Sequence, residues 1–116
     1  MAQFFSAVVV TPGTPQPLQG VTVPAAASIS GALSGIIASR GQTVVLQAGA
    51  GNTAAKSIYI GGRTMNVAAK TGYGITLLPG ASIVIPVCDT EIDLGDFWID
   101  TDSVAASTEK LFVSVL

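Results

Sequence analysis

The stretch "KSIYIGGRTMNVAAKTGYGITLLPGASIVIPV", Lys56–Val87, decides the expected fold class. Hydrophobic residues alternate with other residues, and Gly-Gly and Pro-Gly pairs separate the runs. Ile58 and Ile60 should share one face of a strand, because successive side chains of a strand point to opposite faces. Gly61-Gly62 offers the positive φ that a two-residue hairpin turn needs, and Pro79-Gly80 fits the centre of a type II turn. The stretch therefore predicts antiparallel strands joined by tight turns.

The same alternation continues on both sides of this stretch. The residues expected to point inward are Val44 and Leu46, Ile83, Ile85 and Val87, Phe97 and Ile99, and Leu111, Val113 and Val115. Residues 25–39 favour strand and loop over helix, because glycines and serines weaken a helix there. About seven to nine short strands separated by Gly, Pro and Asn are typical of a sandwich or small barrel. We expect an all-β protein: a single small antiparallel β-sandwich or jelly-roll-like domain with an extended N-terminal arm.

The composition indicates a surface that is hidden from water. Of the 116 residues, 49% are hydrophobic and 10% charged, whereas a typical domain has about 25% charged residues. A membrane span is disfavoured, because the best candidate, residues 20–39, contains Pro24 and several glycines and serines. A secretory signal is also disfavoured, because no basic residue precedes Arg40. The remaining explanation is a surface that packs against other protein.

The first third of the chain carries no charge, since all charged residues lie from Arg40 onward. Residues 1–19 are interpreted as an N-terminal arm with a Pro-rich spacer, and residues 20–116 as the β-sandwich domain. Hydrophobic side chains would be costly to leave in water, so we expect this arm to dock on a neighbouring subunit. A neutral, flexible arm is the alternative. The residues expected to form the docking interface are Phe4, Phe5, Val8, Val9 and Val10.

The residue inventory offers little for catalysis. The sequence has no histidine and one cysteine, Cys88, so a zinc site, an internal disulfide and a histidine-based triad are not expected. Cys88 is interpreted as a small buried side chain near a strand end. Lys56 and Lys70 lie in no catalytic motif. With five Lys and Arg residues and a net charge of −2, nucleic-acid binding is not expected either. We predict no enzyme activity and no cofactor, metal or catalytic residue.

An acidic segment, "DTEIDLGDFWIDTD", spans Asp89–Asp102. Its spacing is partly that of a calcium loop, but Leu94 occupies the position where that loop needs glycine. The simpler interpretation is a solvated loop leading into a strand whose polar face carries Asp96, Asp100 and Asp102. Whether the segment faces solvent, an ion or a basic partner stays open. Trp98 falls on the same face, where it is either an interface anchor or a residue covered by a nearby loop.

A resemblance rests on three segments: "RGQTVVLQAGAGNTAAKSIYIGG" from Arg40, "GYGITLLPGASIVIPV" from Gly72 and the final "LFVSVL". Together they resemble small β-sandwich structural proteins of tailed-bacteriophage virions over residues 40–116. The resemblance implies a capsid decoration, or cement, protein that stabilises the head by binding across neighbouring capsid subunits. It also implies a homotrimer located in the virion and assembled in the host cytoplasm, with the major capsid protein or other virion proteins as partners.

Two other functions remain open. One is a small neck, tail or fibre component of the virion. The other is a tip module that binds a receptor or glycan, in which Trp98 with Tyr59 or Tyr73 would stack on sugar rings.

Overall fold

The computed structural model describes residues 4–10, 12–13, 15–18, 22–23, 31–32, 37–103 and 109–116. Side chains are described for residues 8–10, 12–13, 15–18, 38–103 and 109–116. One short 3-10 helix, η1, spans Leu94–Asp96. The strands are β1 (Phe4–Val9), β2 (Gln16–Pro17), β3 (Thr22–Val23), β4 (Gly31–Ala32), β5 (Ile37–Ala38), β6 (Thr43–Ala48), β7 (Ile58–Asn66), β8 (Thr71–Leu77), β9 (Ser82–Pro86), β10 (Ile92–Asp93), β11 (Trp98–Thr101) and β12 (Lys110–Val115).

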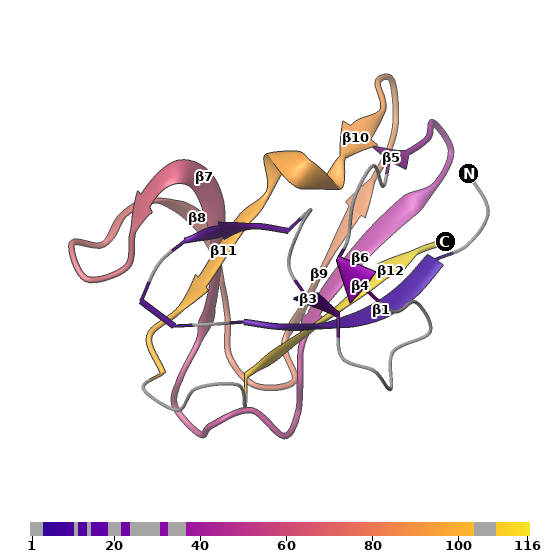
Figure 1. Cartoon of the computed structure of the whole chain (residues 1–116). Helices are drawn as coiled ribbons and strands as arrows, with labels where there is room; N and C mark the ends of the chain where they lie inside the picture. The colour runs from indigo at the N-terminus through magenta and orange to yellow at the C-terminus, as the bar shows by residue number, and fades with distance from the viewer. Residues whose placement is uncertain are drawn as a thin grey trace.

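Eight of these strands form two antiparallel four-stranded sheets. Sheet A has the order β1-β12-β6-β9, and sheet B has the order β2-β11-β7-β8. In Figure 1, sheet A lies on the right and sheet B on the left. Along these eight strands, the chain passes from one sheet to the other after β1, β2, β6, β8, β9 and β11. This arrangement is a small all-β sandwich, as the alternating sequence predicted.

One hydrophobic core fills the space between the two sheets, because each strand turns alternate residues inward. Sheet A contributes Leu46 and Val113, and sheet B contributes Ile60 and Ile99, all at 1% exposure or less. The expected inward residues of β6, β7 and β12 are therefore confirmed. The full buried cluster is Val8, Val10, Leu18, Ala38, Val44, Leu46, Ala48, Ile58, Ile60, Leu77, Val87, Leu94, Ile99, Leu111, Val113 and Val115.

The two turns predicted from glycine pairs have different outcomes. The Pro79-Gly80 turn is confirmed: Gly80 has φ +83°, and the amide of Ala81 donates to the carbonyl of Leu78 at 2.9 Å. The Gly61-Gly62 turn is wrong, because β7 continues through both glycines and the chain reverses only at residues 67–70.

Gly61 is needed for a reason other than a turn. A Cβ atom at Gly61 would collide with the carbonyl oxygen of Gly72 and with Cα of Tyr73, both in β8. The register between β7 and β8 also shifts at this point, which marks a bulge. Glycine therefore lets two backbones approach closely where the ladder is irregular.

The structure differs from the expected N-terminal arm. Residues Phe4–Val9 pair along their whole length with β12, from Phe4 opposite Val115 to Val9 opposite Lys110. The Pro-rich segment also joins the fold, because Gln16 and Pro17 pair with β11 and Leu18 is fully buried. Proline is tolerated there because β2 is an edge strand. The prediction of strand and loop for residues 25–39 falls mostly outside the described residues, which there include only β4 and residues 37–39.

Among the described residues, no helix is long and apolar enough to cross a membrane.

Candidate functional site

The outward side of sheet A is the first candidate for a functional surface. Register and alternation place on it Val9 of β1, Thr43, Val45 and Gln47 of β6, Ser82, Val84 and Pro86 of β9, and Lys110, Phe112, Ser114 and Leu116 at β12. We call this set face A. Lys110 is the only charged residue in the set.

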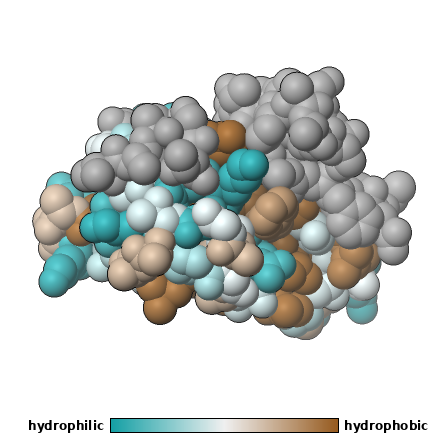
Figure 2. Space-filling view, turned by 90° about the horizontal axis from the view of Figure 1, so that it is seen from below, coloured by the Kyte–Doolittle hydropathy of each residue, from teal (hydrophilic) through white to brown (hydrophobic). Residues whose placement is uncertain are grey.

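Face A exposes hydrophobic side chains to the outside. Val84 is 58% exposed, Leu116 46% and Phe112 41%. Figure 2 shows one end of the molecule, on which hydrophobic residues in brown are more numerous on the side that holds sheet A in Figure 1. A nearly uncharged patch of this kind is typical of a surface that binds other protein.

The predicted interface residues in β1 and at Val10, which follows it, do not form one exposed surface. Val8 and Val10 are fully buried in the core of the same chain, so in this fold they are not exposed for docking on another subunit. Val9 alternates to the other side, is half-buried and belongs to face A. Phe4 and Phe5 pair with Val115 and Ser114, but their side chains lie outside the described part of the chain.

Sequence reasoning missed the residues that make face A apolar. Phe112 and Val84 stand on the outward side of strands whose inward residues were predicted correctly. The signal was present in "LFVSVL", where Phe112 breaks the alternation of hydrophobic and polar residues. An outward Phe in a strand with a complete hydrophobic inner face indicates an apolar outer face as well.

Trp98 lies on the outward side of sheet B, as predicted from alternation with the buried Ile99. It is half-buried and stands between Pro17 and Gly61 in the register. Tyr59 shares this side, and its ring meets that of Tyr73 edge-on with centroids 4.7 Å apart. The sheet thus brings the three aromatic residues of the expected stacking group to one side, with Tyr59 and Tyr73 in contact with each other.

The acidic segment is not one solvated loop. Asp89, Glu91 and Asp96 are exposed, but Asp100 is 3% exposed, which corrects its expected place on a solvated face. Asp100 accepts hydrogen bonds at Oδ1 from the amide of Gly13 at 3.2 Å and from that of Thr101 at 2.8 Å. The proline-rich segment covers Asp100, and this could not be read from the local pattern.

Two more carboxylates fasten the long loop between β6 and β7. Asp102 accepts from the amide of Ser57 at 2.8 Å and from the hydroxyl of Tyr59 at 3.3 Å. Burial and the Asp102 carboxylate raise the pKa of Tyr59. The buried Glu109 accepts from the amide and hydroxyl of Thr53. These acids hold loops in place.

No group of three or more Asp, Glu, His or Cys side chains suited to a metal ion occurs among the described residues. Asp93, one of the calcium-loop candidates, caps η1 instead, accepting from the amide of Gly95 at 2.8 Å. Cys88 is exposed, so its predicted burial is wrong. It follows Val87, whose side chain takes the inward position at the end of β9.

Comparisons with protein-family models, with curated proteins and with solved structures found no match for this chain. The resemblance to virion proteins therefore stays a prediction from the sequence.

Proposed function

We propose that this protein is a non-enzymatic structural protein that assembles with other subunits through face A. The observation that carries the proposal is the exposure of Val84, Phe112 and Leu116 on a sheet side with a single charge, that of Lys110. Burying apolar area is the main driving force for association. Charged residues are depleted at the centre of protein interfaces, and face A meets that condition.

The more specific proposal is a capsid decoration, or cement, protein of a tailed-phage virion, with a homotrimer as its assembly. Its support is the resemblance of residues 40–116 to that group, together with the all-β fold. Its partners would be the major capsid protein or other virion proteins. Face A replaces the N-terminal arm as the proposed contact, because Val8 and Val10 are occupied in the core.

The first test is the mass of the purified protein in solution, measured by light scattering at several concentrations. We expect a trimer. Val84→Lys should shift the mass towards the monomer and raise the dissociation constant about tenfold or more, because an unpaired charge at an interface centre is costly. The matched control is Thr76→Lys, an exposed position on the outward side of sheet B opposite Tyr59, which should keep the trimer.

A monomer at every concentration, or a trimer that Val84→Lys leaves intact, would contradict assembly through face A. The virion role has its own test, co-sedimentation with phage heads that lack this protein. Binding that Val84→Lys abolishes and Thr76→Lys preserves would support it. Wild-type protein that stays in the supernatant would refute it.

A further inference from the structure

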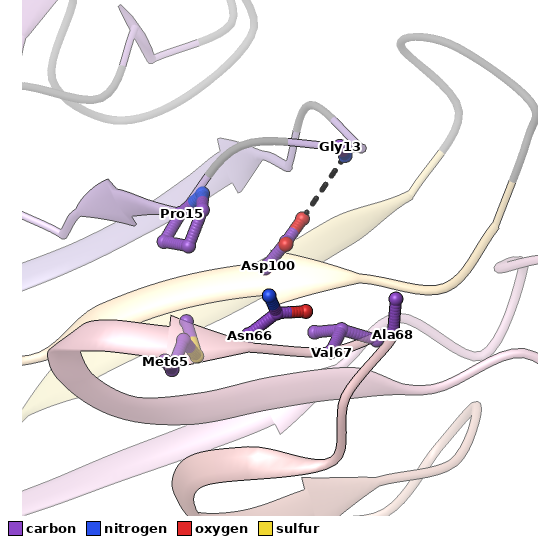
Figure 3. Close-up of a pocket in the computed structure, with 7 residues that line it drawn as sticks. All are labelled: Gly13, Pro15, Met65, Asn66, Val67, Ala68 and Asp100. Atoms are coloured by element: carbon purple, nitrogen blue, oxygen red, sulfur yellow. Dashed lines mark hydrogen bonds between the residues drawn. The ribbon is translucent and has the colours of Figure 1, made fainter.

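A pocket of about 200 Å³ opens beside β11, away from face A (Figure 3). Three segments form it: the turn before β2 with Pro15, the β7–β8 hairpin with residues 65–68, and β11 with Asp100. Segments far apart in the sequence thus meet at one small cavity. Its volume is below the roughly 300–1,000 Å³ that is usual for drug-sized ligands, so an occupant would be about one ring in size.

Asp100 gives this pocket an unsatisfied acceptor. Asp100 is only 3% exposed. The hydrogen bonds that it accepts from the amides of Gly13 and Thr101 both end on Oδ1. Within the described part of the chain, Oδ2 accepts no hydrogen bond. Burial raises the pKa of Asp100, and the two backbone hydrogen bonds offset this only in part. A buried carboxylate oxygen without a partner costs free energy, which a donor entering the pocket would recover.

Asn66 supplies the complementary donor. Its Oδ1 accepts from the amide of Ala69 at 3.0 Å, which fixes the orientation of the side-chain amide. Its Nδ2 makes no hydrogen bond to any described residue, and Figure 3 shows this nitrogen on the side of Asn66 that faces Asp100. Among the described residues, Oδ2 of Asp100 and Nδ2 of Asn66 therefore line the same pocket without a hydrogen-bond partner, on two different strands.

We propose that the pocket binds a small hydroxylated ligand, one ring of a sugar, between Asp100 and Asn66. A hydroxyl group both donates and accepts, so sugar hydroxyls can donate to Oδ2 of Asp100 and accept from Nδ2 of Asn66. Pro15, Met65 and Val67 offer apolar surface to the C–H groups of the ring. An anion would be repelled by the Asp100 carboxylate, and an ammonium group has no acceptor for the N–H groups of Asn66. A neutral polyol suits both.

The ligand is equally a free monosaccharide or the terminal unit of a surface glycan, since the two offer the same hydroxyls. The site does not rest on the assembly role, because face A belongs to the other sheet. Val84→Lys should therefore leave sugar binding unchanged, and a failure of one proposal leaves the other standing.

The experiment is a titration of the full-length ¹⁵N-labelled protein with the methyl glycosides of glucose, galactose and mannose, followed by amide chemical shifts. Concentrations should reach about 100 mM, because a site with few hydrogen bonds is expected to bind in the millimolar range. We expect saturable shifts at Gly13, at residues 66–68 and at Thr101 with at least one sugar. A longer oligosaccharide ending in the same unit then separates the sources, since tighter binding indicates a glycan chain and equal binding a free sugar.

Variants assign the binding to the pocket. Asp100→Asn keeps an acceptor for Gly13 and Thr101 but replaces Oδ2 by a donor, so it should weaken binding about tenfold or more. Asp96→Asn changes an exposed carboxylate outside the pocket and is the matched control. Shifts with none of the three sugars, or shifts that Asp100→Asn leaves unchanged, would overturn the proposal.

Discussion

The strand β1 should contribute strongly to stability, and neighbouring valines allow this to be measured. Val8 and Val10 are fully buried, whereas Val9 between them is half-buried on face A. Valine to alanine removes two carbon atoms. At about 0.8 kcal/mol for each buried group, the transfer loss is about 1.6 kcal/mol per site. The cavity that remains adds to this loss.

The double variant Val8→Ala/Val10→Ala should therefore lose about 3–4 kcal/mol of unfolding free energy, out of the roughly 5–15 kcal/mol that is usual for a domain. Val9→Ala should lose less than about 1 kcal/mol, as is usual for substitutions outside the core. Urea denaturation followed by circular dichroism measures both. The slope of the free energy against urea should stay constant, so that the midpoint reports stability.

Two outcomes would contradict the packing of β1 on the domain. A double variant within about 0.5 kcal/mol of wild type, the range of neutral surface changes, would mean that β1 is detached in solution. A Val9→Ala loss as large as that of the double variant would mean that Val9, and not its neighbours, faces the core. Deletion of residues 1–10 gives a coarser check: it should lose the fold or aggregate, because it uncovers the edge of β12. A docking arm would leave a stable domain after the same deletion.

Two further predictions concern single positions. Gly61→Ala should cost about 1–3 kcal/mol or more in thermal or urea unfolding, because its Cβ meets the backbone of β8 and overpacking has costs of this size. Gly62→Ala is the control and should be close to neutral, because the atom nearest to its added Cβ, the carbonyl oxygen of Gly72, is 4.0 Å away. Equal losses at the two positions would contradict the bulge. Asp100 has a raised pKa, so the folded state holds its proton to higher pH than the unfolded chain, and its contribution to stability falls as pH rises from the unfolded pKa to the raised one. At pH 7, Asp100→Asn should therefore unfold at the same urea concentration as wild type or at a higher one, and the difference should shrink as pH falls. Asp96→Asn is the control. An Asp100→Asn variant whose stability relative to wild type is lower at pH 7 than at pH 4 would contradict this sign.

Local pattern was sufficient for the part of the fold that alternation controls. Ile58 and Ile60 point inward, as do Leu111, Val113 and Val115, because a period of two is a property of the strand itself. The turn at Pro79-Gly80 was also local, since its two residues carry the dihedral preference.

The remaining features depend on residues that are distant in the sequence. Gly61 looks like a turn glycine until β8 lies against it, and Asp100 looks solvated until the segment around Gly13 covers it. Val8 and Val10 look like an arm because their partners, Leu111 in β12 and Glu109 just before it, come about a hundred residues later in the sequence. The absence of charge indicated burial correctly, but it did not say whether the covering surface was another subunit or the same chain.

The pairing of β1 with β12 has a consequence for synthesis. Phe4 meets Val115 and Val9 meets Lys110, so sheet A cannot gain its first strand until β12 has left the ribosome. Until then, the valines of β1 have no strand to pair with, and closing so long a loop slows folding. Nascent chains should therefore hold exposed hydrophobic residues while residues 10–109, which separate the two strands, are made. We expect the yield of folded protein to depend on how well the cell shields β1 until β12 has been made.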